Sequence, residues 1–257
     1  MPRYKLIIDY NGAPFCGWQR QAGHPSVQQT LEEAIEQFTR HFVRLHCAGR
    51  TDTGVHAFHQ VVHVDLEKDW ENATVRDAVN ACLRDRAGNA VPAYISVLSA
   101  EKVSENFNAR LSAIRRHYFY RILNRRAPAG VETGRVWHLP RPVDPDIMHK
   151  AAQYLVGHHD FTTFRSAHCQ APSPFKTLEK LDVIRQGEEI HVFASARSFL
   201  HHQVRSMVGT IAQAGLGRWR AEMVKEALEA RDRKRCGPQA PAYGLYFIGV
   251  DYPLGLV

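Results

Sequence analysis

The sequence predicts an α+β fold made of two related α/β domains. Both halves of the chain run in a similar order, from a strand to a helix, a loop, and then further strands and a helix. With 257 residues, the chain has room for one large domain or two small ones. A polar, basic stretch over residues 104–116 separates the halves. We therefore expect domains at 1–106 and 107–257, with their sheets joined edge to edge over a basic cleft.

The composition narrows the classes of protein that the chain can represent. Its formal net charge of +7 suits a polyanionic partner such as nucleic acid, although a basic solvated surface would give the same total. No run approaches the roughly 18 apolar residues that span a bilayer, and the N-terminus leads directly into a strand without a signal peptide. The five scattered cysteines form no C-x-x-C pair, which argues against a disulfide framework or a thiolate zinc site. A reduced, cytoplasmic protein fits these observations.

In the N-terminal half, apolar periodicity predicts the main elements. Apolar residues alternate over residues 4–10, which indicates a strand with one buried face. The loop that follows contains Phe15, Trp18 and Arg20, and it is either an RNA-stacking surface or a loop pinned by its aromatic residues in the core. Ser26 and Gln29 have the spacing of a capping box that starts a helix. The further elements expected here are a strand over 59–66, a helix over 74–83 and a strand over 94–98.

In the C-terminal half, Asp144 and Pro145 have the pattern of a capping residue and the first residue of a helix. Two alternating runs around Gly187 predict a hairpin. The expected elements, in order, are a strand over 117–123, the helix from 145, hairpin strands over 178–185 and 189–196, a helix opened by residues 199–205, a helix over 221–231 and a strand over 244–252.

The loop over residues 49–56, GRTDTGVH, is the strongest candidate for chemistry. Its two glycines tolerate unusual backbone angles and can hold Asp52 at a fixed direction, with Arg50 two residues away. A carboxylate held in this way can act as a nucleophile or a base, but the same pattern also fits a simple Asx turn. The histidines at 56, 59 and 63 lie on a loop and a strand, and no fourth ligand is obvious. We therefore expect them to form hydrogen bonds rather than bind a metal.

Basic residues outside this loop have two interpretations. Arg205 falls at the border of a helical apolar stripe, so it is either half-buried beside a carboxylate or extends along the surface to solvent. Other basic side chains are candidates for phosphate contacts. These are Arg20, Arg110, Arg115, Arg116, Arg165 and His202.

Nine motifs, taken together, resemble the bacterial tRNA pseudouridine synthase A family over nearly the whole chain. They are YNG (10–12), GWQRQ (17–21), SVQ (26–28), GRTDTGVH (49–56), FNAR (107–110), YFY (118–120), DFT (160–162), FLHHQVR (199–205) and APAYGL (240–245). Three residues depart from the usual family pattern, namely Asn11 for Asp, Thr53 for Ala and Gln239 for Thr. These departures bear on substrate preference rather than on a proposed chemical group.

The resemblance implies that the chain converts uridine to pseudouridine at positions 38, 39 and 40 of the tRNA anticodon stem-loop. It also implies a homodimer that needs no cofactor and no metal. The implied fold is two α/β domains sharing a mainly antiparallel mixed sheet, with the cleft between them.

The resemblance assigns roles residue by residue. Asp52 would be the essential group, attacking C1′ of the sugar, attacking C6 of the base, or removing a proton from C2′. Arg205 would pair with it and favour its charged form. Tyr118 would stack on the uracil and could take the C5 proton, and Leu245 would close the base pocket. The expected substrate contacts also include Arg50, Arg20, Arg110 and His202. Two rivals remain, an RNA-binding module without catalysis and a carboxylate-based nucleoside hydrolase.

Overall fold

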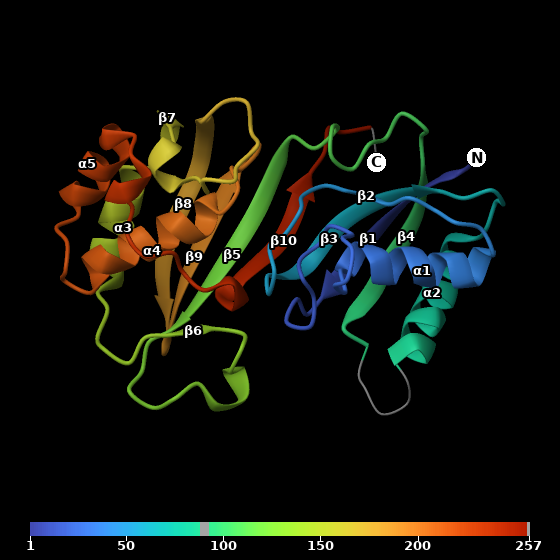
Figure 1. The fold of residues 1–257 in the computed structure, drawn as a ribbon, viewed down its shortest axis with the longest axis horizontal. Coiled ribbons are helices and arrows are strands. Elements are labelled where there is room, and N and C mark those ends of the chain that lie inside the picture. Colours follow the sequence, from blue (N-terminus) through green and yellow to red (C-terminus); the bar gives the residue numbers. More distant parts are fainter. Residues whose placement is uncertain (88–92, 256–257) are drawn as a thin grey trace. The chain divides into compact units, whose positions relative to one another are not determined.

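The computed structural model describes residues 1–87 and 93–255 and confirms the α+β class. Within these residues the chain forms five α-helices and ten strands. It divides into two compact units, one comprising Met1–Arg116 with Phe247–Val257 and the other His117–Tyr246 (Figure 1). The chain passes between the units within two strands, β5 (Arg115–Leu123) and β10 (Leu245–Asp251).

The first unit is built on an antiparallel sheet in which β1 (Arg3–Tyr10) has a partner strand on each side. It pairs with β3 (His56–Asp65) along one edge and with β4 (Ile95–Val103) along the other. The short β2 (His46–Cys47) adds to β3. Helices α1 (Val27–Thr39) and α2 (Asn72–Ala87) pack against each other, and α2 packs against β4 (Figure 1).

The alternation predicted for β1 is confirmed by its burial. Tyr4, Leu6 and Ile8 are fully buried, because alternate side chains of a strand point to the same face. The register places Leu6 opposite Val62 on β3, where both side chains are buried. Such apolar cross-strand pairs stabilise the sheet and keep β3, which follows the Asp52 loop, in a fixed position.

The predicted start of α1 is confirmed in part. The Ser26 side chain accepts a hydrogen bond from the backbone N–H of Gln29, as an N-cap does. The Gln29 side chain donates to Glu33 one turn further along the helix, so this bond does not complete the expected capping box.

In the second unit, β5, β9 (Glu189–Ala196), β8 (Phe175–Gln186) and β7 (Gly157–Asp160) are hydrogen-bonded in that order. The pairs β8–β9 and β7–β8 are antiparallel, and the predicted hairpin turns at Gly187, whose φ is +61°. A short strand, β6 (Trp137–His138), runs parallel to β5, so the strand pairing is mixed.

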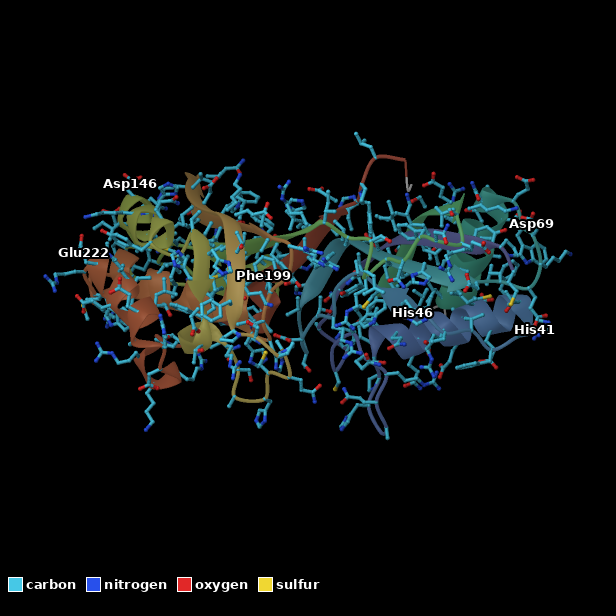
Figure 2. The ribbon with its side chains drawn as sticks, turned by 90° about the horizontal axis from the view of Figure 1, so that it is seen from above. His41, His46, Asp69, Asp146, Phe199 and Glu222 are labelled. Carbon is cyan, nitrogen blue, oxygen red and sulfur yellow. The ribbon has the colours of Figure 1, made fainter. Side chains whose placement is uncertain are left out.

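Three helices complete the second unit, namely α3 (Pro145–Gln153), α4 (Gln203–Gly215) and α5 (Glu222–Ala230). The Asp144 side chain caps α3 by accepting from two backbone N–H groups, as predicted. The helix α3 packs against β8 and α4. Its Lys150 donates at 2.7 Å to Glu222 of α5, the residue labelled in Figure 2. Among the helices of residues 1–87 and 93–255, none is long and apolar enough to cross a membrane.

Candidate active site

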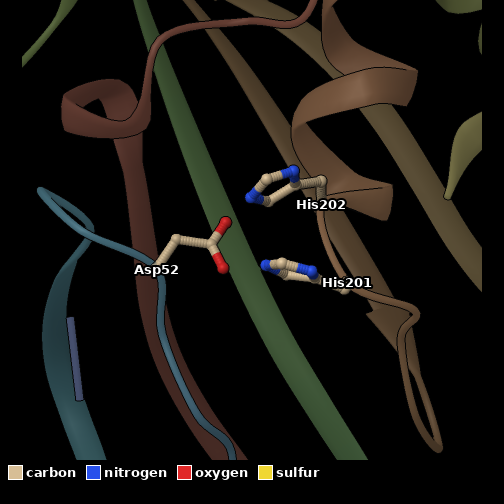
Figure 3. A group of neighbouring side chains, drawn as sticks. All are labelled: Asp52, His201 and His202. Carbon is tan, nitrogen blue, oxygen red and sulfur yellow. The ribbon is translucent and has the colours of Figure 1, made fainter. Parts of the chain in front are cut away.

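Asp52 lies in the loop between β2 and β3, and its side chain is half-buried (Figure 3). Its carbonyl accepts a hydrogen bond from the backbone N–H of Val55 at 3.1 Å, which closes a tight turn. Gly54, the third residue of this turn, has a φ of +77°, a conformation that a type II turn requires at this position and that glycine adopts without strain. The second glycine of the motif is therefore a requirement of the turn that presents Asp52.

The backbone just before Asp52 is held by side chains from other elements. The Gln60 amide of β3 donates to the carbonyl of Gly49 at 2.6 Å. The Arg116 guanidinium donates to the carbonyl of Ala48 through Nε at 3.2 Å and through Nη2 at 3.0 Å. Arg116 also donates to the carbonyls of Ala113 and Arg110. These contacts anchor the start of the loop to the sheet of the first unit.

The loop at Gly12–Gln21 interlocks with the Asp52 loop. The backbone N–H of Gly12 donates to Nδ1 of His56 at 3.0 Å. A Cβ at Gly12 would lie 2.0 Å from the carbonyl oxygen of Val55, and one at Gly17 would lie 2.8 Å from that of Thr51. Only glycine permits so close an approach of two backbones.

The aromatic residues of the same loop belong to the core. Trp18 is 1% exposed and Phe15 is 7% exposed. Of the two interpretations of this loop, the core one is confirmed, because buried rings are not presented for stacking on RNA bases.

Two of the three histidines of this region, His56 and His63, form hydrogen bonds as predicted. His56 accepts from Gly12, and Nδ1 of His63 accepts from the backbone N–H of Ala109 at 3.0 Å. Burial lowers the pKa of His63 to about 4, and the positive charge of Arg3 and the neighbouring His46 add to this shift. His63 is therefore neutral at physiological pH, with its Nδ1 engaged.

The arginines of the first unit that were predicted to contact phosphate differ in their exposure and in their pairing with carboxylates. Arg50 and Arg110 are exposed. Arg20 donates to the buried carboxylate of Glu32 at 3.1 Å, and Arg44 lies 3.6 Å from the same carboxylate. A shallow depression of about 510 Å³ adjoins this group. Its lining residues are Arg20, Gln21, Ala22, Gly23, Gln29 and Arg44.

The predicted site residues that lie in the second unit include Tyr118, Leu245, Arg205 and His202. The ring of Tyr118 on β5 is half-buried and meets Phe199 edge to face, with centroids 5.1 Å apart. Leu245, the first residue of β10, is buried. Arg205 on α4 is half-buried, and its Nε donates to the carbonyl of Ala240 at 2.9 Å. Arg205 is thus half-buried, while the carboxylate partner expected for it stays a prediction.

His201 and His202 come directly before α4 (Figure 3), and their ring centroids lie 3.9 Å apart. The φ of His202 is +66°, in the left-handed region that residues other than glycine seldom adopt. Its carbonyl accepts from the backbone N–H of Ser206 and so begins the helix. A strained residue that persists at a helix start is a feature often found at functional sites.

The sequence comparison decides the family. Residues 6–101 and 151–253 match a family model described as tRNA pseudouridine synthase. The chain belongs to this family. The resemblance predicted from the nine motifs is therefore confirmed.

Curated relatives of the family match over almost their full length. A protein of Methylobacterium nodulans named tRNA pseudouridine synthase A is 59% identical over 253 residues, covering 98% of this chain and 97% of its own. Proteins of the same name from Mesorhizobium japonicum and Bartonella bacilliformis are 58% and 55% identical, each covering 98% of this chain and 100% of its own.

A solved structure titled as a Cbf5-Nop10-Gar1 complex was also matched. It aligns with 81% of this chain at 12% identity and a TM-score of 0.35. The alignment takes in only 44% of the chain in that structure. A likeness at this level carries no argument about the family member described here.

Sequence reasoning missed several residues that support the family's Asp52 loop. Gln60 was not singled out, although its side chain fixes Gly49. Arg116 was predicted to contact phosphate, and the structure shows its guanidinium donating to backbone carbonyls of the first unit. Gly12 and Gly17 lie in two of the nine motifs, and their place in these motifs was the signal that could have identified them as supports of the loop. Each contact joins residues far apart in sequence, so spacing alone could not reveal it.

Proposed function

We propose that this protein isomerises uridine to pseudouridine at positions 38, 39 and 40 of the tRNA anticodon stem-loop, with Asp52 as the essential nucleophile or base. Membership of the tRNA pseudouridine synthase family supports the isomerase activity and the tRNA substrate. The observation that carries the assignment of Asp52 is the anchoring of its loop. Hydrogen bonds hold the backbone on both sides of Asp52, while its half-buried side chain projects from the turn.

The reaction breaks the N1–C1′ bond, turns the uracil, and joins C5 to C1′. The proton lost from C5 is balanced by the proton gained at N1, so no atom or electron enters or leaves. We therefore propose catalysis without a cofactor or a metal. Asp52 attacks C1′, attacks C6, or removes the C2′ proton, and all three routes require an ionised carboxylate.

The region 107–257 supplies the remaining proposed groups of the reaction, and the region 1–106 supplies the carboxylate. Tyr118 stacks on the uracil and takes the C5 proton late in the reaction, and its edge-to-face contact with Phe199 holds the orientation of its ring. Leu245 closes the base pocket. Arg205 stabilises the ionised form of Asp52 during the reaction, and its hydrogen bond to Ala240 limits the freedom of its guanidinium.

The target base must leave its stack before it can react, at a cost of a few kcal/mol. Contacts of basic side chains with phosphates offset this cost. Arg50 and Arg110 are exposed and suit this role, with Arg20 and His202 as further contacts. We also propose that the protein acts as a homodimer.

The proposal is tested with tRNA transcribed in vitro, which carries no modification. Pseudouridine is mapped by carbodiimide adducts after incubation with the wild-type protein. The expected result is new adducts confined to positions 38, 39 and 40, absent when those uridines are replaced by cytidine. Released uracil would instead indicate a hydrolase. Bound but unchanged tRNA would indicate a binding module.

A further inference from the structure

The hydroxyl of Tyr10 makes a buried contact next to the proposed catalytic residue. Tyr10 is the last residue of β1, and its Oη lies 2.8 Å from Oγ1 of Thr51, the neighbour of Asp52. Tyr10 is 4% exposed and Thr51 is 8% exposed, so water does not compete for this bond. Burial also raises the pKa of Tyr10, which keeps its hydroxyl neutral at physiological pH.

Thr51 is held at a second point. Its carbonyl accepts from the backbone N–H of Trp18 at 3.0 Å, and Trp18 is fixed in the core. The side chain and the main chain of Thr51 are therefore bound to two different segments. Because β1 is hydrogen-bonded to β3 on one side and to β4 on the other, the Tyr10 contact ties Thr51 to a strand that is held along both edges.

We infer that Tyr10 is a positioning residue for Asp52, acting through Thr51 to fix the direction in which the carboxylate leaves its loop. This inference rests on the proposed function. The Val55–Asp52 turn fixes the backbone after Asp52, while the Trp18 and Tyr10 contacts hold the main chain and the side chain of Thr51 before it. A displacement of about 1 Å at a reacting group can cost on the order of 100-fold in rate.

The test compares two tyrosines of the same strand. Tyr4 and Tyr10 lie on the same buried face of β1, and Tyr4 donates to the carbonyl of Trp70 at 2.6 Å, away from the Asp52 loop. Tyr10→Phe removes the hydroxyl that contacts Thr51, and Tyr4→Phe removes a hydroxyl that bonds both Trp70 and Asp69. Tyr4→Phe is therefore expected to lose at least as much stability as Tyr10→Phe. Only Tyr10→Phe is expected to lower kcat for pseudouridine formation, by about 10-fold or more, with KM unchanged within about twofold.

Changes at Thr51 provide the second arm of the test. Thr51→Val removes the hydroxyl and is expected to lower kcat as Tyr10→Phe does, whereas Thr51→Ser keeps the hydroxyl and restores most of the rate. The double variant Tyr10→Phe, Thr51→Val is expected to be no slower than either single variant, because both remove the same contact.

The outcomes separate two failures. If the wild type is active and the kcat of Tyr10→Phe equals that of Tyr4→Phe, the inference is overturned while the proposed function stands. If the wild type makes no pseudouridine in any tRNA, the proposed function fails, and the inference is overturned with it.

Discussion

The Asp52 loop of the first unit and the turn before α4 in the second unit hold their residues in different ways. In the Asp52 loop, Gly54 takes the left-handed conformation, Gln60 and Arg116 donate to backbone carbonyls, and Tyr10 contacts the side chain of Thr51. In the turn before α4, His202 itself has a left-handed φ of +66°. The first arrangement directs a carboxylate with little strain, whereas the second keeps strain in His202, a residue that we propose contacts the substrate.

The largest expected effect on stability comes from a change at Gly12, where the two loops of the first unit approach closely. Gly12→Ala places a Cβ 2.0 Å from the carbonyl oxygen of Val55, so the two loops must separate. We expect the free energy of unfolding to fall by about 3 kcal/mol, as overpacking of a well-packed site does. Urea denaturation measures the change.

The matched control for this change is Gly23→Ala. Gly23 also has a positive φ, of +77°, but has open space around it, so only the backbone cost of about 1 kcal/mol is expected. Equal losses for the two variants would show that the contact between the loops does not stabilise the fold.

A smaller loss of stability is expected from a change at Glu32, whose carboxylate binds Arg20 of the loop that adjoins Asp52. Glu32 is 1% exposed and accepts from Arg20, from Gln28 and from the backbone N–H of Leu45. Glu32→Gln removes the charge and is expected to lower the free energy of unfolding by about 1–2 kcal/mol, since the arginine partner is partly exposed and screened. Thermal denaturation is the measurement.

Glu33→Gln serves as the control, because Glu33 lies 4.0 Å from Arg20 and is more exposed than Glu32. A change within about 0.5 kcal/mol is expected there. If Glu33→Gln proved as costly as Glu32→Gln, burial of the carboxylate would not explain the stability of this loop.

The strain at His202 predicts that glycine is the more stable replacement at this position. His202→Gly should be more stable than His202→Ala by about 1 kcal/mol, because alanine must adopt the same left-handed conformation and glycine does so freely. Chemical denaturation of the two variants measures this difference. An alanine variant at least as stable as the glycine variant would mean that the turn relaxes, and that the contrast with the Asp52 loop is not one of strain.

The smallest expected effect at neutral pH is the contribution of His63 to the pH dependence of stability. Its pKa is about 4 in the folded protein and near 6.5 when unfolded, so the unfolded chain binds more protons between these values. Stability from the neutral imidazole is complete above about pH 6.5 and falls as the pH is lowered towards 4. The urea midpoint of the wild type should drop across this window more steeply than that of His63→Asn. Parallel pH profiles of the two proteins would contradict the assignment.

Sequence reasoning located the elements and the Asp52 loop because these depend on local patterns. The alternation of apolar residues predicted β1, and Asp144 as a capping residue predicted the start of α3. The ends of elements were less accurate, since β3 begins at His56 rather than 59 and α2 extends to Ala87 rather than 83. The core position of Trp18 could not be separated from an exposed one, because an aromatic residue in a loop fits both.

The supports of the site could not be predicted, because they join distant positions. The bond between Tyr10 and Thr51 spans 41 residues, and that between Arg116 and Ala48 spans 68. The pairing of Arg20 with Glu32 required a buried carboxylate on a helix that reads as amphipathic. In sequence such an arginine is indistinguishable from one that is free to bind phosphate.

The most direct test of the central claim is the activity of Asp52→Asn. This change keeps the size and shape of the side chain, removes its charge and replaces one carboxylate oxygen by an NH2 group. We predict that the variant binds unmodified tRNA as the wild type does and forms no pseudouridine at positions 38, 39 or 40 within the sensitivity of carbodiimide mapping. Pseudouridine formation by Asp52→Asn at a rate within about tenfold of the wild type would contradict the claim that the Asp52 carboxylate carries the reaction.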